Sequence, residues 1–196
     1  MTEALKNRSN AGEKERNIYA NYINDLYCRE LSAQNRKIIL NYSIGAEPLP
    51  YESGSKLRTE TVFELAALFY KYNNLKFSLY SSSLHQNQAL CTLARELPNV
   101  SLSAYWWHNF FPSSMRQIIF QRLDMLPANK QVGFFSDAYC VDWAYAKAEM
   151  VRKQFAQVLS EKISQGQYTF DYALMIAEHI LYKTPQELCY MIPSDF

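Results

Sequence analysis

The residue of this chain best placed to do chemistry is Asp137, which follows the short apolar part of segment 131–139. This run predicts a strand over 132–136, and a helical pattern follows it, so the carboxylate should lie where a strand ends and a helix begins. In α/β proteins the loops at that edge converge on one crevice, where ligand groups gather. A carboxylate there can hold a metal ion or act as a general base. It can equally cap the following helix, because Asp is a favoured N-cap residue.

Two tryptophans and a histidine end the preceding apolar run, 100–106. If the strand continues, Trp106 and Trp107 point to opposite faces, so one faces the cleft and the other packs against helices. His108 follows them and can contact a ligand, although a hydrogen-bonded surface histidine is the commoner outcome. The same strand end can therefore serve a binding site or simple packing.

Other polar residues at predicted strand and helix ends have simpler interpretations. Ser81, Ser82 and Ser83 can bind an anion at a helix N-terminus, but capping of that helix explains them as well. Asp142 is expected to cap the long helix, and His85 and His179 are expected to be structural. Ser43 lacks the flanking glycines of a nucleophile elbow, so it is not expected to be an activated nucleophile.

Alternating strands and helices are needed to bring these residues together, and the chain has that pattern. Alternation of this kind predicts a parallel sheet with right-handed crossovers. Four such units match half of an eightfold barrel or a small open doubly wound sheet. The prolines and glycines of 44–58 exclude a helix there. Strands are predicted at 37–43, 76–80, 100–106 and 132–136, and helices at 17–33, after a cap at Thr59 or Thr61, and at 86–97, 113–126, 142–165, 170–182 and 184–191.

Length and composition indicate one α/β domain over 17–196, preceded by a mobile leader over 1–16, because 196 residues with 48% hydrophobic content suit one core. A net charge of +1 gives no reason to expect nucleic acid or an anionic membrane as a partner. No apolar run approaches the roughly 18 residues of a membrane span, and a signal core is lacking, so a cytoplasmic protein is expected. The widely separated cysteines Cys28, Cys91, Cys140 and Cys189 are expected to be reduced and buried.

The strand ends also carry a family resemblance. Segments 39–46, 79–80 with 87–93, 103–107 with Asn109, and 133–137 resemble, in order and spacing, the C-terminal half of uronate (glucuronate) isomerase, a family of the amidohydrolase superfamily. The resemblance covers about 20–190, and the Trp-Trp pair and the strand-ending Asp are its most distinctive parts. It implies an α/β fold of four βα units, equivalent to the C-terminal half of a (β/α)8 TIM barrel.

The resemblance also implies roles for single residues. Asp137 would be the catalytic and metal-binding carboxylate, and the substrate would be bound by Trp106, Trp107, His108, Tyr139 and Ser43. The chain departs from the family at three points. Ser43 stands where the family commonly has His, Tyr139 stands where it usually has Arg, and no two histidines form the His-x-His that supplies two metal ligands. A divalent metal such as zinc would therefore be incompletely held.

The implied activity is aldose–ketose isomerisation of a sugar acid, glucuronate to fructuronate, in a barrel completed by an N-terminal half. We expect the chain alone to be inactive. Because an open half-barrel leaves two sheet edges and one apolar face uncovered, a homo-oligomer or a complementary half-barrel is expected. Two alternatives stay open: an inactive barrel fragment that acts as a binding or assembly subunit, and a superfamily hydrolase with another substrate.

Overall fold

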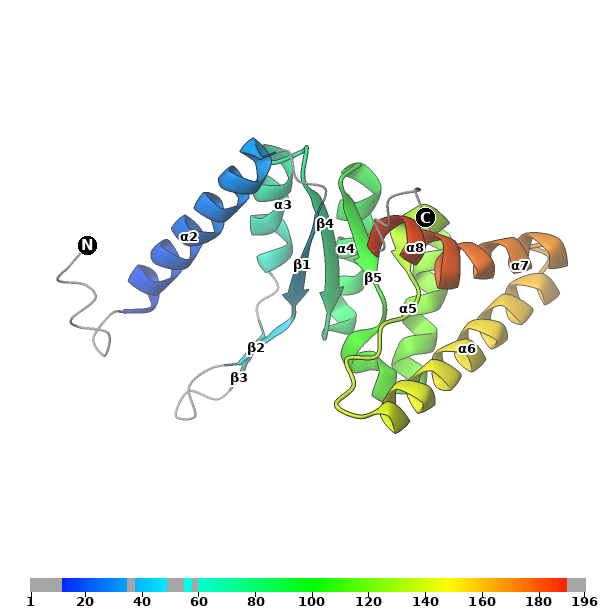
Figure 1. The fold of residues 1–196 in the computed structure, drawn as a ribbon. Coiled ribbons are helices and arrows are strands. Elements are labelled where there is room, and N and C mark those ends of the chain that lie inside the picture. Colours follow the sequence, from blue (N-terminus) through cyan, green and yellow to red (C-terminus); the bar gives the residue numbers. More distant parts are fainter. Residues whose placement is uncertain (1–11, 35–37, 49–54, 58–59, 190–196) are drawn as a thin grey trace. The chain divides into compact units, whose positions relative to one another are not determined.

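The computed structural model describes residues 12–34, 38–48, 55–57 and 60–189 (Figure 1). The chain divides into two units, Met1–Arg36 and Lys37–Phe196. The first contains helix α2 (Glu13–Ala33), where a helix over 17–33 was predicted. It begins earlier than predicted because the carboxylate of Glu15 accepts a hydrogen bond from the Gly12 N–H at 3.0 Å and so caps the first turn. Residues 13–16, predicted as leader, are therefore helical, and 1–11 lie outside the described residues.

The second unit is built on a parallel sheet in the order β1-β4-β5-β6, which confirms the predicted fold class. One face of the sheet carries the apolar residues Leu40, Tyr42, Phe77, Leu79 and Leu102, which share a face by their pairing. Alternation along each strand places this face toward the helices. The strands are β1 (Ile39–Ile44), β4 (Lys76–Ser81), β5 (Val100–Ser103) and β6 (Gln131–Val132).

The opposite face of the sheet is mostly polar, although Ile39 and Tyr80 also belong to it by their pairing. Asn41 pairs with Ser78, and Ser78 pairs with Ser101. The hydroxyl of Ser78 is hydrogen-bonded to that of Ser103 on the neighbouring strand. The expectation that the second face of the sheet is apolar is therefore wrong, because serine and asparagine stand where an apolar layer would need large aliphatic side chains.

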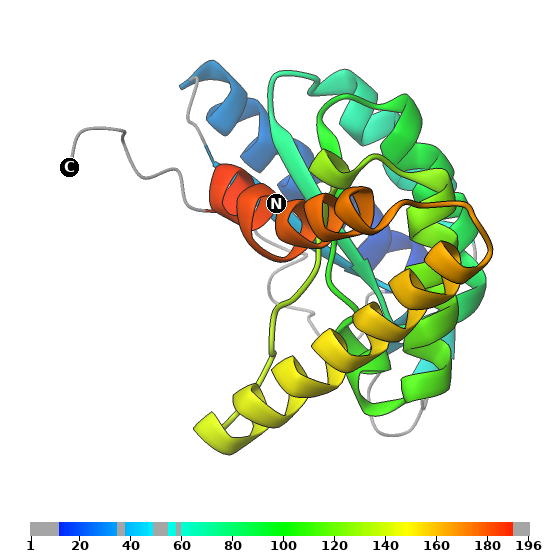
Figure 2. The same ribbon diagram turned by 90° about the vertical axis from the view of Figure 1, so that its right-hand side faces the viewer.

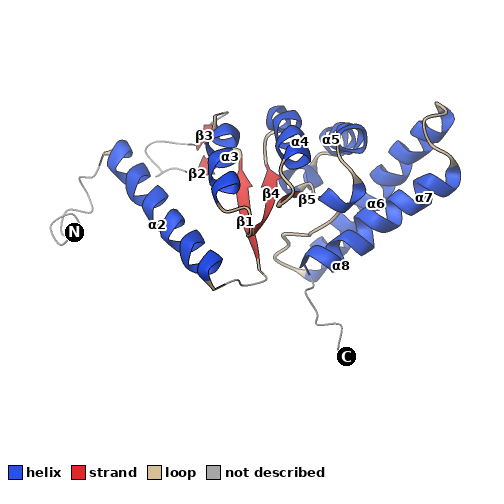
Figure 3. Ribbon diagram, turned by 90° about the horizontal axis from the view of Figure 1, so that it is seen from above, coloured by secondary structure: helices blue, strands red, loops and turns tan. Residues whose placement is uncertain are grey.

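Three helices cover the apolar face, as Figure 3 shows. Their inward residues pack on the strands, and Phe69 of α3 meets Tyr42 and Phe77 with ring centroids 5.9 and 4.5 Å away. Burial of this aromatic surface stabilises the layer. The helices are α3 (Thr61–Lys71), α4 (Asn87–Glu96) and α5 (Pro112–Met125).

Two local predictions between β1 and α4 need revision. Part of the predicted loop 44–58 is an antiparallel pair, β2 (Ala46–Pro48) with β3 (Ser55–Leu57). Thr61 begins α3, whereas Glu60 holds the N-cap position, and Thr59 and 49–54 lie outside the described residues. A short 3-10 turn, η2 (Leu84–Gln86), precedes α4.

Strand β5 ends at Ser103, not at 106 as predicted. Ala104 turns the chain with φ 40°, and its N–H donates to the Val132 carbonyl at 2.5 Å, while the Arg122 guanidinium binds its carbonyl at 2.6 Å. Because these partners are distant in sequence, the run 100–106 could not show the turn. Trp106 then starts a 3-10 helix, η3 (Trp106–Phe110), so the two tryptophans do not alternate as strand residues.

Strand β6 is also shorter than predicted, since it ends at Val132 rather than 136. The next amide, that of Gly133, donates to the Ile180 carbonyl at 2.8 Å, so the chain leaves the sheet and binds a C-terminal helical turn. A Cβ at Gly133 would lie 2.7 Å from Leu181 Cδ2 and 2.9 Å from the Ile180 oxygen. Glycine allows this close approach.

The C-terminal helices fill the remaining side of the second unit. Figure 2 shows α7, η5 and α8 running on as one helical stretch after α6. A break at Gly166, with φ 72°, separates the two parts as predicted. The elements are α6 (Val141–Ser164), α7 (Phe170–Glu178), the π-helical turn η5 (His179–Lys183) and α8 (Thr184–Cys189); η4 (Ala128–Lys130) precedes β6.

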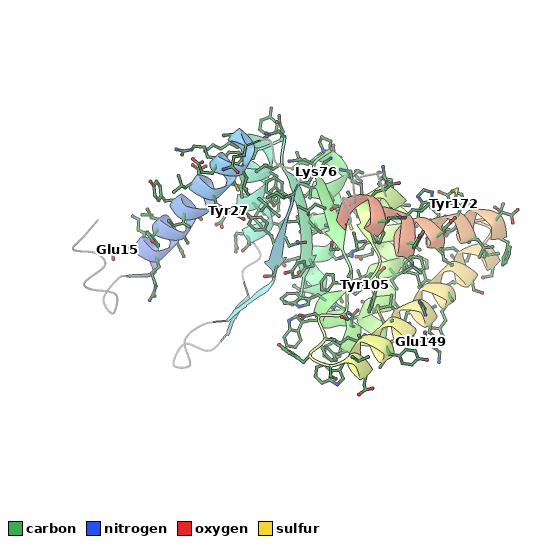
Figure 4. The ribbon with its side chains drawn as sticks, in the orientation of Figure 1. Glu15, Tyr27, Lys76, Tyr105, Glu149 and Tyr172 are labelled. Atoms are coloured by element: carbon green, nitrogen blue, oxygen red, sulfur yellow. The ribbon has the colours of Figure 1, made fainter. Side chains whose placement is uncertain are left out.

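A second apolar cluster joins Tyr105, which precedes η3, to α5, α6, α7 and η5. Tyr105, labelled in Figure 4, is 2% exposed within it and lies under the Arg122 guanidinium, 5.4 Å from the ring centroid. Burial raises the pKa of Tyr105 above its usual range, and Arg122 partly offsets this. Among the described residues, no helix is both long enough and apolar enough to span a membrane.

Candidate functional site

The segments that follow β5 and β6 meet beside the end of β4. Tyr80, the fifth residue of β4, touches the rings of Trp106 and Phe135, each with centroids 5.1 Å away and nearly perpendicular planes. These edge-to-face contacts join strand β4 to η3 and to the segment after β6, which are far apart in sequence. The segments that follow two of the strands therefore converge at the end of a third, whereas the roles predicted for their residues stay predictions.

Asp137 lies beside these rings and is hydrogen-bonded to Trp106, another residue that the sequence predicted for the site. Its Oδ2 accepts from the indole Nε1–H of Trp106 at 2.9 Å, and the side chain is exposed. Asp137 does not cap α6, because Cys140 holds the N-cap position. Asp142 lies in the first turn of α6, so it is not the cap either. The carboxylate of Asp137 thus keeps one oxygen available at the surface.

The backbone is strained around this carboxylate. Among the described residues, three non-glycine residues have positive φ, namely Ala104 (40°), Trp106 (37°) and Asp137 (43°). Each such conformation costs on the order of 1–3 kcal/mol and persists only when the surrounding structure imposes it. All three belong to the two segments that form the Trp106–Asp137 contact. Strain of this kind gathers at functional sites.

A continuous run of aromatic rings extends outward from Trp106. Trp107 is 52% exposed, and the ring contacts lead on through Phe110 and Trp143 to Tyr139, with centroid distances between 6.1 and 6.2 Å. Tyr139 is 92% exposed and rests on Trp143. These rings form an aromatic wall beside Asp137, defined here as Trp106, Trp107, Phe110, Tyr139 and Trp143.

His108 is not a surface residue, contrary to the simpler of its two interpretations. It is 6% exposed, and its Nε2 has no hydrogen-bond partner among the described residues. Burial, with a smaller contribution from the Arg122 charge, lowers the pKa of His108 to about 4, and a hydrogen bond to the Ser81 backbone offsets part of this. The ring is therefore neutral at pH 7. A buried neutral imidazole at this position supports the loop rather than presenting a charge to a ligand.

The remaining candidates lie at the edge of this site or away from it. Ser43 is exposed on β1 and pairs with Tyr80 of β4, so it reaches the same end of the sheet. The serine run makes local turn bonds, since Ser81 Oγ accepts from the Ser83 N–H at 3.0 Å. The Ser83 side chain does not cap η2. His85 lies on the outer side, where it lines a groove between α3 and α4.

Lys147 is a site residue that the sequence interpretation missed. Its Nζ donates to the carbonyls of Ser136 at 2.9 Å and Asp137 at 3.2 Å, and it lies over the rings of Phe110 and Trp143 at 4.4 and 5.5 Å. A signal was present in the sequence: Lys147 stands four residues before Val151 on the buried stripe of α6, where an apolar residue would be expected.

The described residues do not by themselves fit a metal ion. Nowhere in 12–34, 38–48, 55–57 or 60–189 do three His, Cys, Asp or Glu side chains gather as a metal would require. Asp137 offers one carboxylate oxygen, whereas zinc is usually held by about four ligands. Cys28 and Cys91 are buried and Cys140 is exposed, so the expectation of burial is wrong for Cys140. The zinc expectation itself stays a prediction.

Comparison of the sequence with curated proteins finds relatives that are named uronate isomerase. The uronate isomerases of Thermotoga sp. (strain RQ2) and Thermotoga maritima are each 26% identical to the chain over 141 residues, which is 70% of this chain and 31% of each relative. The chain therefore spans about a third of the length of the curated relatives it matches. No protein-family model matches the chain.

Comparison of structures gives the same result for the fold. The chain superposes on the crystal structure of Thermotoga maritima uronate isomerase with a TM-score of 0.81 and 21% identity, covering 92% of this chain and 42% of that one. Glucuronate isomerase from Caulobacter crescentus gives a TM-score of 0.78 and 16% identity, covering 94% and 41%. The predicted resemblance to uronate isomerase is thus confirmed in sequence and in fold, over a part of those longer proteins.

Proposed function

We propose that the chain forms one part of a uronate-isomerase-like (β/α)8 barrel and contributes the Asp137 carboxylate and the aromatic wall to its site. In the completed barrel this site would interconvert the aldose and ketose forms of a sugar acid, glucuronate and fructuronate. The observation that carries the proposal is the strained Asp137, held by Trp106 at the end of a parallel sheet. We place the protein in the cytoplasm.

Asp137 suits a role in proton transfer or metal binding in this proposal. Moving a proton between adjacent carbons needs a positioned base, a group that polarises the carbonyl oxygen, and a cation for the sugar-acid carboxylate. Asp137 can fill the first role, and the exposed Trp107 can pack against a sugar. The hydrogen bond that Trp106 donates to Asp137 fixes the position of the carboxylate and leaves its negative charge in place.

The other two roles need groups beyond those described. No metal cluster is formed by the described residues, and Tyr139, at the position where the resemblance implies Arg, carries no positive charge. A complementary barrel part would supply further metal ligands, such as a His-x-His, and a substrate-binding cation. A second copy of the chain or a separate half-barrel is the proposed partner, because the open edge of β1 pairs on one side only among the described strands.

A second candidate function is an inactive binding or assembly subunit. It is favoured by the exposed Tyr139, because a tyrosine hydroxyl cannot replace the bidentate charge of Arg toward a carboxylate. In that case the chain would complete a barrel but would not support turnover. The two functions differ in whether the completed barrel is active.

The first prediction concerns the chain by itself. The purified chain should not convert glucuronate to fructuronate, with or without added zinc, and should bind zinc only weakly, because one carboxylate is a poor site. Conversion is followed by the formation of the ketose. Turnover by the chain alone that disappears in Asp137→Ala would show that the required groups lie within the chain, and would contradict the need for a complementary part.

A further inference from the structure

We propose that Lys147 is a positioning residue, which clamps the segment between β6 and α6 so that Asp137 keeps its strained conformation. The inference rests on the proposed role of Asp137 for its functional meaning. The clamp itself depends only on contacts in the structure. It joins helix α6 to the segment that bears the carboxylate.

The Lys147 ammonium is held on two sides. Two of its N–H groups donate to consecutive carbonyls, those of Ser136 and Asp137, at 2.9 and 3.2 Å. The faces of Phe110 and Trp143 cover it, with the Nζ 4.4 and 5.5 Å from the ring centroids. Charge-assisted hydrogen bonds and cation–π contacts are both stronger when water is excluded, and Lys147 is only 6% exposed.

A buried lysine without a carboxylate needs an explanation. None of the carboxylates in the described part of the chain forms an ion pair with Lys147, which instead contacts the two carbonyls and the two rings. Removing an ammonium from water is costly unless it is compensated. An aliphatic residue on the stripe of Val151 and Phe155 would fill the space without this cost. The presence of a lysine here is therefore explained by the two carbonyls that its ammonium binds.

The contacts of Lys147 and Trp106 act on the same residue from opposite ends. Trp106 binds the side chain of Asp137, and Lys147 binds its backbone carbonyl. A left-handed φ of 43° is uncommon for a non-glycine residue, and these two contacts hold Asp137 in it. Loss of the ammonium should let the segment relax to ordinary φ values, and the carboxylate should then leave Trp106.

Tryptophan fluorescence can measure this directly, because the chain has three tryptophans and all lie in the aromatic wall. Replacing Trp107 and Trp143 by Phe leaves Trp106 as the single tryptophan, which red-edge excitation selects over the tyrosines, and keeps an aromatic ring beneath Lys147. In this background Asp137→Ala defines the emission of a Trp106 that has lost its carboxylate. The test variant is Lys147→Met, and the control is Lys153→Met, which changes another lysine of the same helix.

We expect Lys147→Met to shift the Trp106 emission in the same direction as Asp137→Ala and by at least half as much, with Lys153→Met unchanged. The double variant Lys147→Met/Asp137→Ala should have the same emission as Asp137→Ala alone, because both changes break the same Trp106–Asp137 hydrogen bond. If Lys147→Met does not fold by circular dichroism, Lys147→Gln takes its place, with the same shift expected. An unchanged emission, or shifts that add in full, would overturn the proposal. Emission needs no turnover, so failure of the isomerase proposal leaves this result unaffected.

Discussion

Buried charged and titratable side chains support the loops of this site, and each is compensated differently. Arg122, 3% exposed, donates to Asn87 Oδ1 at 3.0 Å and to the Ala104 carbonyl at 2.6 Å. Lys147 uses carbonyls and aromatic faces, whereas His108 stays neutral. Arg122 and Lys147 bind backbone carbonyls of the two segments that form the Trp106–Asp137 contact, and His108 bonds to the backbone of Ser81 at the end of β4. At the scale of residues, the site therefore depends on Arg122 and Lys147, which bind its backbone, as well as on the Asp137 carboxylate.

His108 should make stability depend on pH. Its folded pKa, about 4, lies below the unfolded value of 6.5, so the unfolded chain binds more protons between these values. The stability that His108 contributes is complete above pH 6.5 and is lost as the pH falls toward 4, with a loss of roughly 2 kcal/mol between pH 7 and pH 5. Urea unfolding at pH 7 and pH 5 measures it. His108→Asn should flatten the slope, whereas His85→Asn, in the outer groove, should not; equal slopes for all three proteins would contradict the assignment.

At the scale of elements, periodicity predicted the helices and parallel strands well. The errors fall where long-range backbone hydrogen bonds decide the geometry. Strands β5 and β6 are shorter than their apolar runs because Ala104 binds Val132 and Gly133 binds Ile180. Asp137 and the Trp pair were identified from the sequence, but their contact was not, because it depends on these turns. Lys147 was missed because a charge within an apolar stripe was not treated as a signal.

The exit of the chain from β6 can be tested at Gly133. Gly133→Ala should lower the free energy of unfolding by about 1–3 kcal/mol, because the new methyl group would overlap the Ile180 carbonyl and the Leu181 side chain. Gly12→Ala is the control, since no described atom lies within 4 Å of the position that its new methyl group would take, and it should cost less than about 0.5 kcal/mol. Equal effects in chemical denaturation would mean that Gly133 is not closely packed.

The packing of α5 on α6 includes a buried lysine that can be tested separately. Lys162 is fully buried, and its Nζ lies 2.5 Å from Asp124 Oδ1, whose side chain is 51% exposed. Asp124→Ala should cost about 1–3 kcal/mol, because it removes the carboxylate partner of Lys162 and leaves the buried ammonium with the neutral Gln167 side-chain oxygen and the Phe120 ring. Adding Lys162→Met should restore part of this loss. Glu149→Ala, which breaks an exposed pair with Arg152, is the control and should change unfolding by less than about 0.5 kcal/mol. A double variant less stable than Asp124→Ala would contradict this interpretation.

At the scale of the whole molecule, the second unit is an open parallel sheet with helices on its apolar face. Its other face carries Asn41, Ser78 and Ser101, which suits a polar interior or a site better than a dry interface. The expectation of association therefore rests on the open edge of β1 and on the aromatic wall, not on an apolar sheet face. Exposed aromatic surface of this extent commonly marks an interaction or ligand site.

The central claim is that this chain supplies the Asp137 part of an isomerase site that another barrel part completes. The most direct measurement mixes the chain with the portion of Thermotoga maritima uronate isomerase that it does not match, in the presence of zinc, and follows conversion of glucuronate. We predict turnover by the mixture, none by either part alone, and a loss of at least about a hundredfold with Asp137→Ala, as expected for a general base. A stable one-to-one complex without turnover, or turnover unaffected by Asp137→Ala, would contradict the claim.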